Sequence, residues 1–275
     1  MTDLRYLIIT DLDGTLLNYE TFSYKPILSF IKKIITKKIL IIPNTSKTKD
    51  EVLKFLNEIK YLTPFIVESG SAIYFPKKFD YSGKIKINDF ELIYSSKNKK
   101  SINKVLNSKD FQNYKNLYRT TSKIKNTDLA DLSGLSIKNL KDIKKRDFSE
   151  LIIWDSSKKN LNKFKMLLNK KDLSLLEGAR FLHLKGKGDK GIAINKLLKF
   201  MKSSNINVNK TISLGDSKND IPMLNRTDFS CIIKLPNKNY INFNGESVFR
   251  SKKEAPLGWK EALMSIEEFA DYVYE

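Results

Sequence analysis

Two carboxylates behind an apolar run are the residues with the clearest chemical potential in this sequence. Asp11 and Asp13 follow residues 6–10, which are apolar or β-branched, and Gly14 comes directly after them. Such a run predicts a short buried strand that delivers both acids into a tight turn at its carboxyl end. Open α/β sheets bind their ligands just outside that end of their strands. Two acids there, with Gly14 allowing close backbone approach, can hold a hard cation beside a nucleophilic oxygen.

A second polar segment follows the next predicted strand. Residues 27–35 have apolar positions at helical spacing, and the apolar run over 38–43 leads into Thr45, Ser46 and Lys47. Strand, helix and strand in this order predict a parallel, doubly wound sheet. A hydroxyl group and free backbone N–H groups at this point can hold a phosphate oxygen. Taken alone, either hydroxyl is better explained as the cap of the helix that follows.

A third polar segment follows the apolar run over 211–214. Asp216 and Asp220 lie four residues apart behind a tight glycine turn. If this strand neighbours the first one, these acids converge with Asp11 and Asp13. Oxygen ligands and a phosphate partner favour Mg²⁺ over zinc, since the chain has one His and one Cys. We therefore predict a Mg²⁺ cofactor held by these four acids, with Asp220 acting directly, through water, or as an orienting group.

Together these segments resemble the motifs of the haloacid dehalogenase superfamily of phosphatases. Asp-x-Asp-Gly-Thr-Leu over 11–16 is similar to its first motif, and Gly-Asp-x-x-Asn-Asp over 215–220 is similar to its fourth. Thr45 matches the second motif. Lys190, which opens a predicted helix, matches the third, with Lys187 as the alternative lysine.

The resemblance implies a role for each of these side chains. Asp11 is expected to attack phosphorus and form an aspartyl-phosphate intermediate. Asp13 is expected to protonate the leaving alkoxide and then to activate water. Thr45, Lys190 and Mg²⁺ are expected to neutralise the oxygens of the phosphoryl group. The predicted enzyme is a phosphoric monoester hydrolase.

A narrower resemblance concerns the mannosyl-3-phosphoglycerate phosphatase branch. Thr-Ser-Lys-Thr over 45–48 looks like the second motif of that branch, and residues 64–74 resemble its "PFIVENGAAIY". Ser69 stands where the branch usually has Asn, a difference expected to alter a loop near the substrate without abolishing activity. The branch implies hydrolysis of mannosyl-3-phosphoglycerate to mannosylglycerate, a compatible solute. A glucosyl substrate and a broader sugar-phosphate phosphatase remain open alternatives.

The predicted fold is α/β, with a doubly wound, Rossmann-like parallel-sheet core and an inserted α+β cap domain. Residues 1–81 and 187–275 are expected to form the core, because all four motifs lie there. Residues 82–186 change texture, with clustered turn signals and mixed helical and extended patterns, and the family carries its cap between the second and third motifs. A cap joined by two crossings can close over a substrate.

The cap contributes candidates for substrate recognition. An Arg-x-x-Ser-Glu segment and a Gly-Ala-Arg-Phe segment resemble stretches of the branch, and their charged residues suit a carboxylate, a phosphate or sugar hydroxyls; surface ion pairing explains them equally well. His183 is expected to be a packed core histidine. The predicted substrate-binding residues are Gly14, Ser46, Lys47, Arg146, Glu150, Arg180 and Asn219.

Composition bounds the alternatives. The chain has 275 residues, 41% of them hydrophobic, which suits a globular protein. Its net charge of +19 raises the alternative of a basic nucleic-acid-binding protein on an inactive phosphatase fold. The charge is mostly lysine and is scattered along the chain, which argues against that alternative. A single cysteine and the lack of a long apolar run predict a cytoplasmic protein that binds no membrane, of unknown oligomeric state.

Overall fold

A five-stranded parallel sheet forms the centre of the molecule. The computed structural model describes residues 2–37, 39–77, 89–134, 136–178, 180–237 and 239–275. The strand order is β12–β11–β10–β1–β2. The strands are β1 (Thr2–Thr10), β2 (Leu40–Pro43), β10 (Ile206–Gly215), β11 (Phe229–Lys234) and β12 (Val248–Glu254). The predicted α/β class with a parallel sheet is confirmed.

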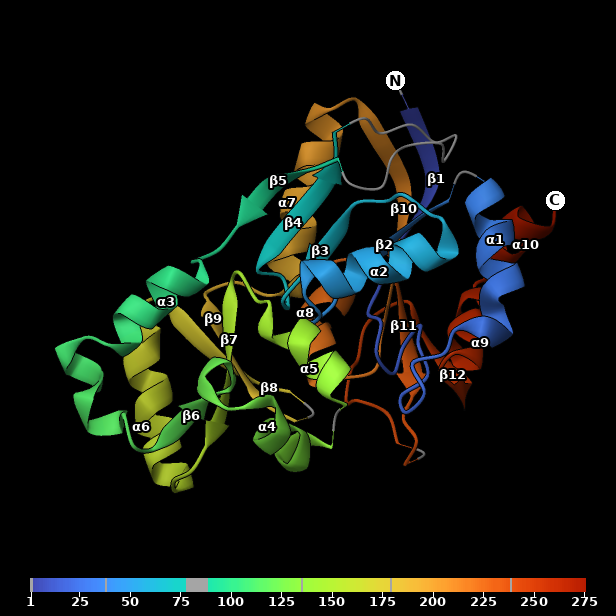
Figure 1. The fold of residues 1–275 in the computed structure, drawn as a ribbon. Helices are drawn as coiled ribbons and strands as arrows, with labels where there is room; N and C mark the ends of the chain where they lie inside the picture. The colour runs from blue at the N-terminus through green and yellow to red at the C-terminus, as the bar shows by residue number, and fades with distance from the viewer. Residues whose placement is uncertain (1, 38, 78–88, 135, 179, 238) are drawn as a thin grey trace.

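Helices cover both faces of this sheet (Figure 1). They are α1 (Leu28–Thr36), α2 (Lys49–Ile59), α7 (Lys190–Ser203), α8 (Ile221–Leu224), α9 (Leu257–Met264) and α10 (Glu267–Tyr274). Figure 1 shows α1, α9 and α10 together on one side and α7 with α8 on the other. Single turns of 3₁₀ helix occur at Lys25–Ile27 and Lys218–Asp220.

The register of the central strands decides where the polar segments meet. β1 is buried continuously from Tyr6 to Thr10, as its apolar sequence predicts. Thr10 pairs with Leu214 of β10, and the N–H of Asp11 extends this ladder by donating to the carbonyl of Leu214 at 3.0 Å. The segments that follow β1 and β10 therefore begin side by side at the same edge of the sheet.

A second sheet of three antiparallel strands adjoins β2. It consists of β3 (Phe65–Val67), β4 (Ala72–Pro76) and β5 (Phe90–Ser95). A parallel bridge between Asn44 and Ile66 joins β3 to the end of β2. The loop between β3 and β4 thus lies next to the polar segment that follows β2.

A third, four-stranded antiparallel sheet forms the cap, in the order β6–β7–β9–β8. Its strands are β6 (Tyr118–Thr120), β7 (Ser149–Trp154), β8 (Leu173–Glu177) and β9 (Leu182–Gly186). Its helices are α3 (Lys99–Leu106), α4 (Asn126–Ser133), α5 (Ile137–Lys144) and α6 (Lys158–Asn169), with 3₁₀ turns at Lys109–Tyr114 and Thr121–Lys123. Phe164 of α6 is fully buried among aromatic rings, which gives the cap a hydrophobic cluster of its own.

The predicted domain boundaries stay a prediction. The boundary between residues 81 and 82 lies outside the described residues. Beyond it, β5 pairs with β4, so this part of the predicted cap range is hydrogen-bonded to the core. The other predicted boundary, between residues 186 and 187, falls between the end of β9 and the start of α7. Within the described part of the chain, no helix combines the length and the apolar character needed to cross a bilayer.

Candidate active site

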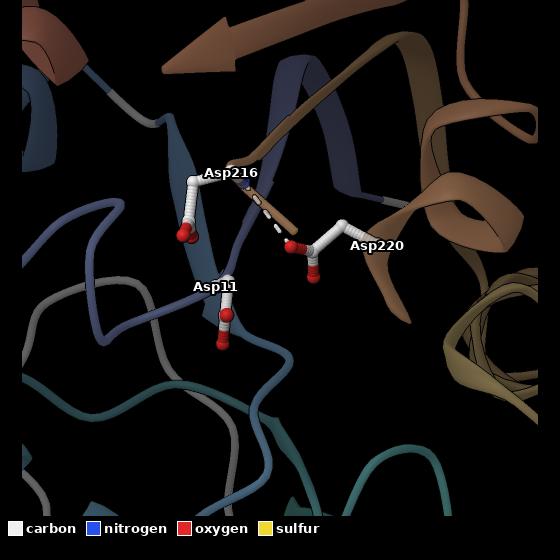
Figure 2. Close-up of side chains that lie close together, drawn as sticks. All are labelled: Asp11, Asp216 and Asp220. Atoms are coloured by element: carbon white, nitrogen blue, oxygen red, sulfur yellow. Dashed lines mark hydrogen bonds between the residues drawn. The ribbon is translucent and has the colours of Figure 1, made fainter. Parts of the chain in front are cut away.

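Three aspartates from distant parts of the chain meet at the carboxyl edge of the central sheet. Asp11 follows β1, Asp216 follows β10, and Asp220 lies on the 3₁₀ turn after it. Each offers a carboxylate oxygen within 4.8 Å of the others. Figure 2 shows the three carboxyl groups turned toward a common space. The convergence of Asp11 with the later acids follows from the pairing of β1 with β10.

Burial and mutual repulsion govern the charge state of this cluster. Asp11 is 7% exposed, Asp216 4% and Asp220 0%. Burial, together with the charges of Asp220 and Asp13, raises the pKa of Asp11 to about 6 against the opposing effect of Lys190. Burial, followed by the charges of Asp220 and Asp11, also raises the pKa of Asp216. A cluster of this kind is stable in its charged form only with cations beside it.

Lys190 is one such cation. Its ammonium Nζ lies 3.0 Å from Oδ1 of Asp11 and 2.6 Å from Oδ1 of Asp220. Burial favours the neutral amine, but the two carboxylates outweigh it and raise the pKa of Lys190. The alternative, Lys187, pairs instead with Asp172 in the cap at 2.9 Å, with more than half of its side chain exposed. Of the two candidate lysines, Lys190 is therefore the one that contacts the acids.

Asp220 is bonded through both of its oxygens. Besides the ion pair of Oδ1 with Lys190, its Oδ2 accepts from the N–H of Asp216 at 3.1 Å. The N–H and the hydroxyl of Ser217 donate to the same oxygen at 2.9 and 2.8 Å. Asn219 is turned to the same serine, whose hydroxyl donates to its Oδ1 at 2.9 Å. These bonds make Asp220 the group that fixes the loop carrying Asp216.

The turn after β1 packs directly on Asp216. Gly14 has a φ of +77°, and a Cβ built on it would come 2.8 Å from Oδ2 of Asp216. The neighbouring Thr15 donates from its hydroxyl to Oδ1 of Asp216 at 2.6 Å. Only glycine combines this backbone conformation with this approach. Thr15 was not among the predicted site residues, although its place within the first motif was a usable signal.

Asp13 lies apart from the three clustered acids and faces a cavity. Its Oδ2 pairs with Nζ of Lys47 at 2.9 Å, and its buried Oδ1 has no hydrogen-bond partner. Its side chain is 36% exposed, far more than that of Asp11. The carboxylates of Asp13 and Glu51 outweigh burial and raise the pKa of Lys47. The position of Asp13 suits proton transfer to a bound molecule.

The cavity has a volume of about 280 Å³ and lies between the core and the cap. One wall comes from the segments after β1 and β2 and from α2, and the other from α5, β7 and the approach to β9. The core contributes Asp13, Leu17, Phe22, Tyr24, Ser46, Lys47, Glu51, Lys54, Phe55 and Glu58, and the cap contributes Asp142, Ile143, Arg146, Leu151, Arg180, Phe181 and His183. The lining mixes acidic and basic side chains with aromatic rings, which suits a polar, charged molecule.

The predicted cap residues divide into two groups. Arg146 and Arg180 line the cavity. Arg146 is 7% exposed, and its Nη1 donates to the carbonyl of Ser46 at 3.1 Å while its buried Nε has no partner. Glu150 is absent from the cavity lining. Its carboxylate is engaged by Lys99 and Ser122, because alternate residues of β7 face opposite sides of the cap sheet.

Two further predicted residues lie where β2 ends. Thr45 is fully buried, and its Oγ1 accepts from the N–H of Lys47 at 3.3 Å. Thr48 caps α2 through a capping box with Glu51, so the cap of this helix is neither Thr45 nor Ser46. This leaves the segment over 45–47 available to face the cavity, where Ser46 and Lys47 lie.

The expectation that His183 is only a packed core residue was incomplete. The imidazole packs on Gly178 and also lines the cavity. Burial lowers the pKa of His183 to about 3, and the charges of Arg146, Lys185 and Lys190 add to the effect. His183 is therefore a neutral donor and acceptor near pH 7. In the sequence His183 stands in an apolar stretch that predicts a strand, and this pattern does not indicate which of its side chains line a cavity.

The donor chemistry fits a hard divalent cation. The cluster offers carboxylate oxygens alone, and their mutual repulsion is relieved by a positive ion. Asp11 and Asp216 are the residues that would hold it, because the oxygens of Asp220 are already bonded. Such an ion would supply positive charge for the oxygens of a transferring phosphoryl group.

The fold and the acid cluster define a class of protein, and sequence comparison agrees with it. Residues 8–254 match the family of haloacid dehalogenase-like hydrolases. The chain belongs to this family. The resemblance of the motifs is thereby confirmed, together with the prediction of an enzyme that is a phosphoric monoester hydrolase.

Two curated relatives match nearly the whole chain. The chain is 33% identical over 270 residues to the glucosyl-3-phosphoglycerate/mannosyl-3-phosphoglycerate phosphatase of Persephonella marina, covering 94% of this chain and 96% of the relative. It is 30% identical over 282 residues to the protein of the same name from Methanococcoides burtonii, covering 96% and 97%.

Solved structures share the fold at lower identity. A haloacid dehalogenase-like hydrolase from B. subtilis has a TM-score of 0.62 at 18% identity, covering 95% of this chain and 98% of the other. The sucrose-phosphatase of Synechocystis sp. PCC6803 has a TM-score of 0.60 at 14% identity, covering 98% and 99%. At these identities the likeness establishes the fold alone.

Proposed function

We propose that the protein hydrolyses a glycosyl-3-phosphoglycerate, with the mannosyl or glucosyl compound as substrate, to the glycosylglycerate and phosphate. The observation that carries the proposal is the buried cluster of Asp11, Asp216, Asp220 and Lys190, with Asp13, two residues after Asp11, in the wall of a mixed-charge cavity. The names of the two curated relatives support the substrate class. The product would be a compatible solute formed in the cytoplasm.

The reaction needs two displacements at phosphorus. A carboxylate oxygen of Asp11 attacks phosphorus, and the bond from phosphorus to the glycerate oxygen breaks. Asp13 donates a proton to the departing alkoxide and then takes one from the water that hydrolyses the aspartyl-phosphate. Lys190 and the segment at Thr45 hold the phosphoryl oxygens. Mg²⁺ held by Asp11 and Asp216 would supply further positive charge.

Helix α2 offers a wall for the rest of the substrate. Glu51, Lys54, Phe55 and Glu58 recur at helical spacing and all line the cavity. Glu51 lies beside Lys47, 3.7 Å away, whereas Glu58 is seven residues further on, about 10 Å along the helix axis. We place the phosphoglycerate end at Lys47, Ser46 and Arg146, and the sugar near Glu58.

Phosphate release tests this proposal. We expect at least one glycosyl-3-phosphoglycerate to be hydrolysed with a kcat/KM about tenfold or more above simple sugar phosphates. The variant Asp11→Asn should lose about a thousandfold or more of this activity, since it lacks the nucleophile. Equal rates on all phosphorylated sugars would favour the broader sugar-phosphate phosphatase. Full activity of Asp11→Asn would contradict the role of Asp11 as the nucleophile.

A further inference from the structure

The loop between β3 and β4 carries a buried glutamate that contacts the cap. Glu68 is 2% exposed. Its carboxylate accepts from the N–H of Asp147 at 3.0 Å, from the N–H of Phe148 at 3.2 Å, and from the hydroxyl of Ser149. These three donors form one segment at the start of cap strand β7. Because a buried carboxylate needs donors in place of water, the bonds fix this segment against the core.

The backbone of the same loop contacts the segment that carries Thr45. The N–H of Glu68 donates to the carbonyl of Lys47 at 2.9 Å, and the N–H of Ser69 donates to the carbonyl of Thr45 at 2.9 Å. Glu68, whose side chain binds the cap, is therefore also hydrogen-bonded through its backbone to the segment expected to hold the phosphoryl group.

The loop also packs on the beginning of α7. Residues 68, 69 and 70 have φ values of +51°, +56° and +84°, a left-handed turn that only glycine adopts freely. A Cβ built on Gly70 would lie 2.3 Å from the carbonyl oxygen of Asp189 and 2.8 Å from the N of Lys190. The turn is thus in close contact with the residue that pairs with the nucleophile.

Arg146 of the cap also contacts the core. Nη1 of Arg146 donates to the carbonyl of Ser46 at 3.1 Å and to the hydroxyl of Ser149 at 3.2 Å. Ser149 in turn donates to Glu68. Hydrogen bonds of Glu68, Ser149 and Arg146 therefore join the cap to the core next to Ser46, which lines the cavity.

We propose that Glu68 is a positioning residue that holds the cap against the loop carrying Thr45 and the start of α7, which carries Lys190. The seating sets the place of Arg146 in the cavity, and thereby the selectivity for substrates long enough to reach the cap. This inference rests on the proposed function only for the identity of that long substrate. Glu68 itself touches no reacting atom in this scheme.

Hydrogen exchange tests the seating without any substrate. In Glu68→Gln, an amide N–H₂ replaces one acceptor oxygen, so the N–H groups of Asp147 and Phe148 should exchange about tenfold or more faster, as expected for losing a bond to a charged acceptor. The matched control is Glu177→Gln, which removes a surface carboxylate paired with Lys165 in the cap. Unchanged exchange in Glu68→Gln would overturn the proposal.

Kinetics separates positioning from general stability. Glu68→Gln should lower kcat/KM for the glycosyl-3-phosphoglycerate about tenfold or more, mainly through KM. Its activity on p-nitrophenyl phosphate, which has neither the glycerate carboxylate nor the sugar of the proposed substrate, should change less than about threefold. Equal losses on both substrates would show a merely structural role.

A second variant tests the same contact if Glu68→Gln folds poorly. Ser149→Ala removes one of the three donors from the cap side, and it should shift the same two measurements in the same direction by a smaller factor. If the wild-type enzyme released no phosphate from a glycosyl-3-phosphoglycerate, the proposed function would fail. The exchange result would still decide the role of Glu68.

Discussion

Asp216 illustrates how a single side chain in this site depends on its neighbours. Thr15 donates to one of its oxygens, Gly14 packs against the other, and Asp11 and Asp220 repel its charge. The local cost of three buried carboxylates is offset in part by Lys190. A divalent cation would offset more of it, so this residue gives a test of metal binding that needs no turnover.

Mg²⁺ should raise the thermal unfolding midpoint of the wild-type protein. An ion at 100 times its Kd stabilises the folded state by about 2.7 kcal/mol. Asp216→Asn should lose most of this increase, because it removes a charged ligand, whereas the cap-surface variant Asp155→Asn should keep it. Calorimetry with Mg²⁺ and with EDTA provides the comparison, and an equal increase in all three proteins would contradict the assigned ligand.

His183 gives a pH test at the same scale. Burial lowers its pKa from 6.5 to about 3, so below pH 6.5 the unfolded chain binds a proton that the folded protein does not. Stability is therefore lost as the pH falls from about 6.5 toward 3, at up to about 1.4 kcal/mol per pH unit.

The variant His183→Gln isolates this contribution. Between pH 7 and pH 5 the wild-type protein should lose about 1–2 kcal/mol more of its unfolding free energy than the variant does. Urea unfolding at the two pH values measures the difference. Parallel losses in both proteins would mean that the imidazole is accessible to solvent protons in the folded state.

Among the elements, α2 joins the phosphate end of the cavity to its far end. Its N-terminus is fixed by the capping box of Thr48 and Glu51, which places Lys47 beside Asp13. One face of the helix then lines the cavity for two turns, and α5 of the cap packs nearby (Figure 1). Near the far end, the hydroxyl of Tyr24 lies 3.4 Å from Glu58.

Glu58→Gln tests the sugar end of this wall. We expect KM for the glycosyl-3-phosphoglycerate to rise about three- to tenfold with kcat within about twofold, because a contact far from phosphorus stabilises substrate and transition state alike. Asn57→Gln, a change at the neighbouring exposed position outside the cavity lining, is the control. A fall in kcat with unchanged KM would place Glu58 nearer the reacting atoms.

At the scale of the whole molecule, the net charge of +19 surrounds a buried acidic cluster. The positive field attracts anions, and the proposed substrate carries a phosphate and a carboxylate. Composition raised the alternative of a basic nucleic-acid-binding protein. The acid cluster and the match to a hydrolase family favour an enzyme instead. Scattered lysines then act as a general attraction for anions.

Salt should weaken this attraction without affecting the chemical step. Raising NaCl from about 0.03 to 0.3 M shortens the screening length from about 18 to about 6 Å. We expect kcat/KM for the glycosyl-3-phosphoglycerate to fall severalfold while kcat stays within about twofold. Initial rates at constant Mg²⁺ provide the measurement. Tight, Mg²⁺-independent binding of duplex DNA with no phosphate release would instead revive the nucleic-acid alternative.

The sequence by itself determined the features that depend on near neighbours in the chain. Apolar runs predicted the strands that precede Asp11 and Asp216, and the order of strand, helix and strand predicted the parallel sheet. The resemblance of the motifs predicted the family. Strand β12 and helix α9 were not predicted, because the alternation in Val248–Glu254 is weak and Leu257–Met264 is short. Local patterns carry this information because strand, turn and helix preferences act over a few residues.

Only the tertiary structure decided which side chains meet. Thr15 and Asp216 are 201 residues apart in the chain, and their hydrogen bond was not predicted. The motif already favoured Lys190 over Lys187, but the contact of Lys190 with Asp11 and Asp220 depends on the packing of α7. The side chain of Glu150 lies on the face of β7 that points away from the cavity, and the loop between β3 and β4 brings Glu68 to the cap. Such contacts depend on strand pairing and on the seating of the cap, which bring together residues that no local pattern links.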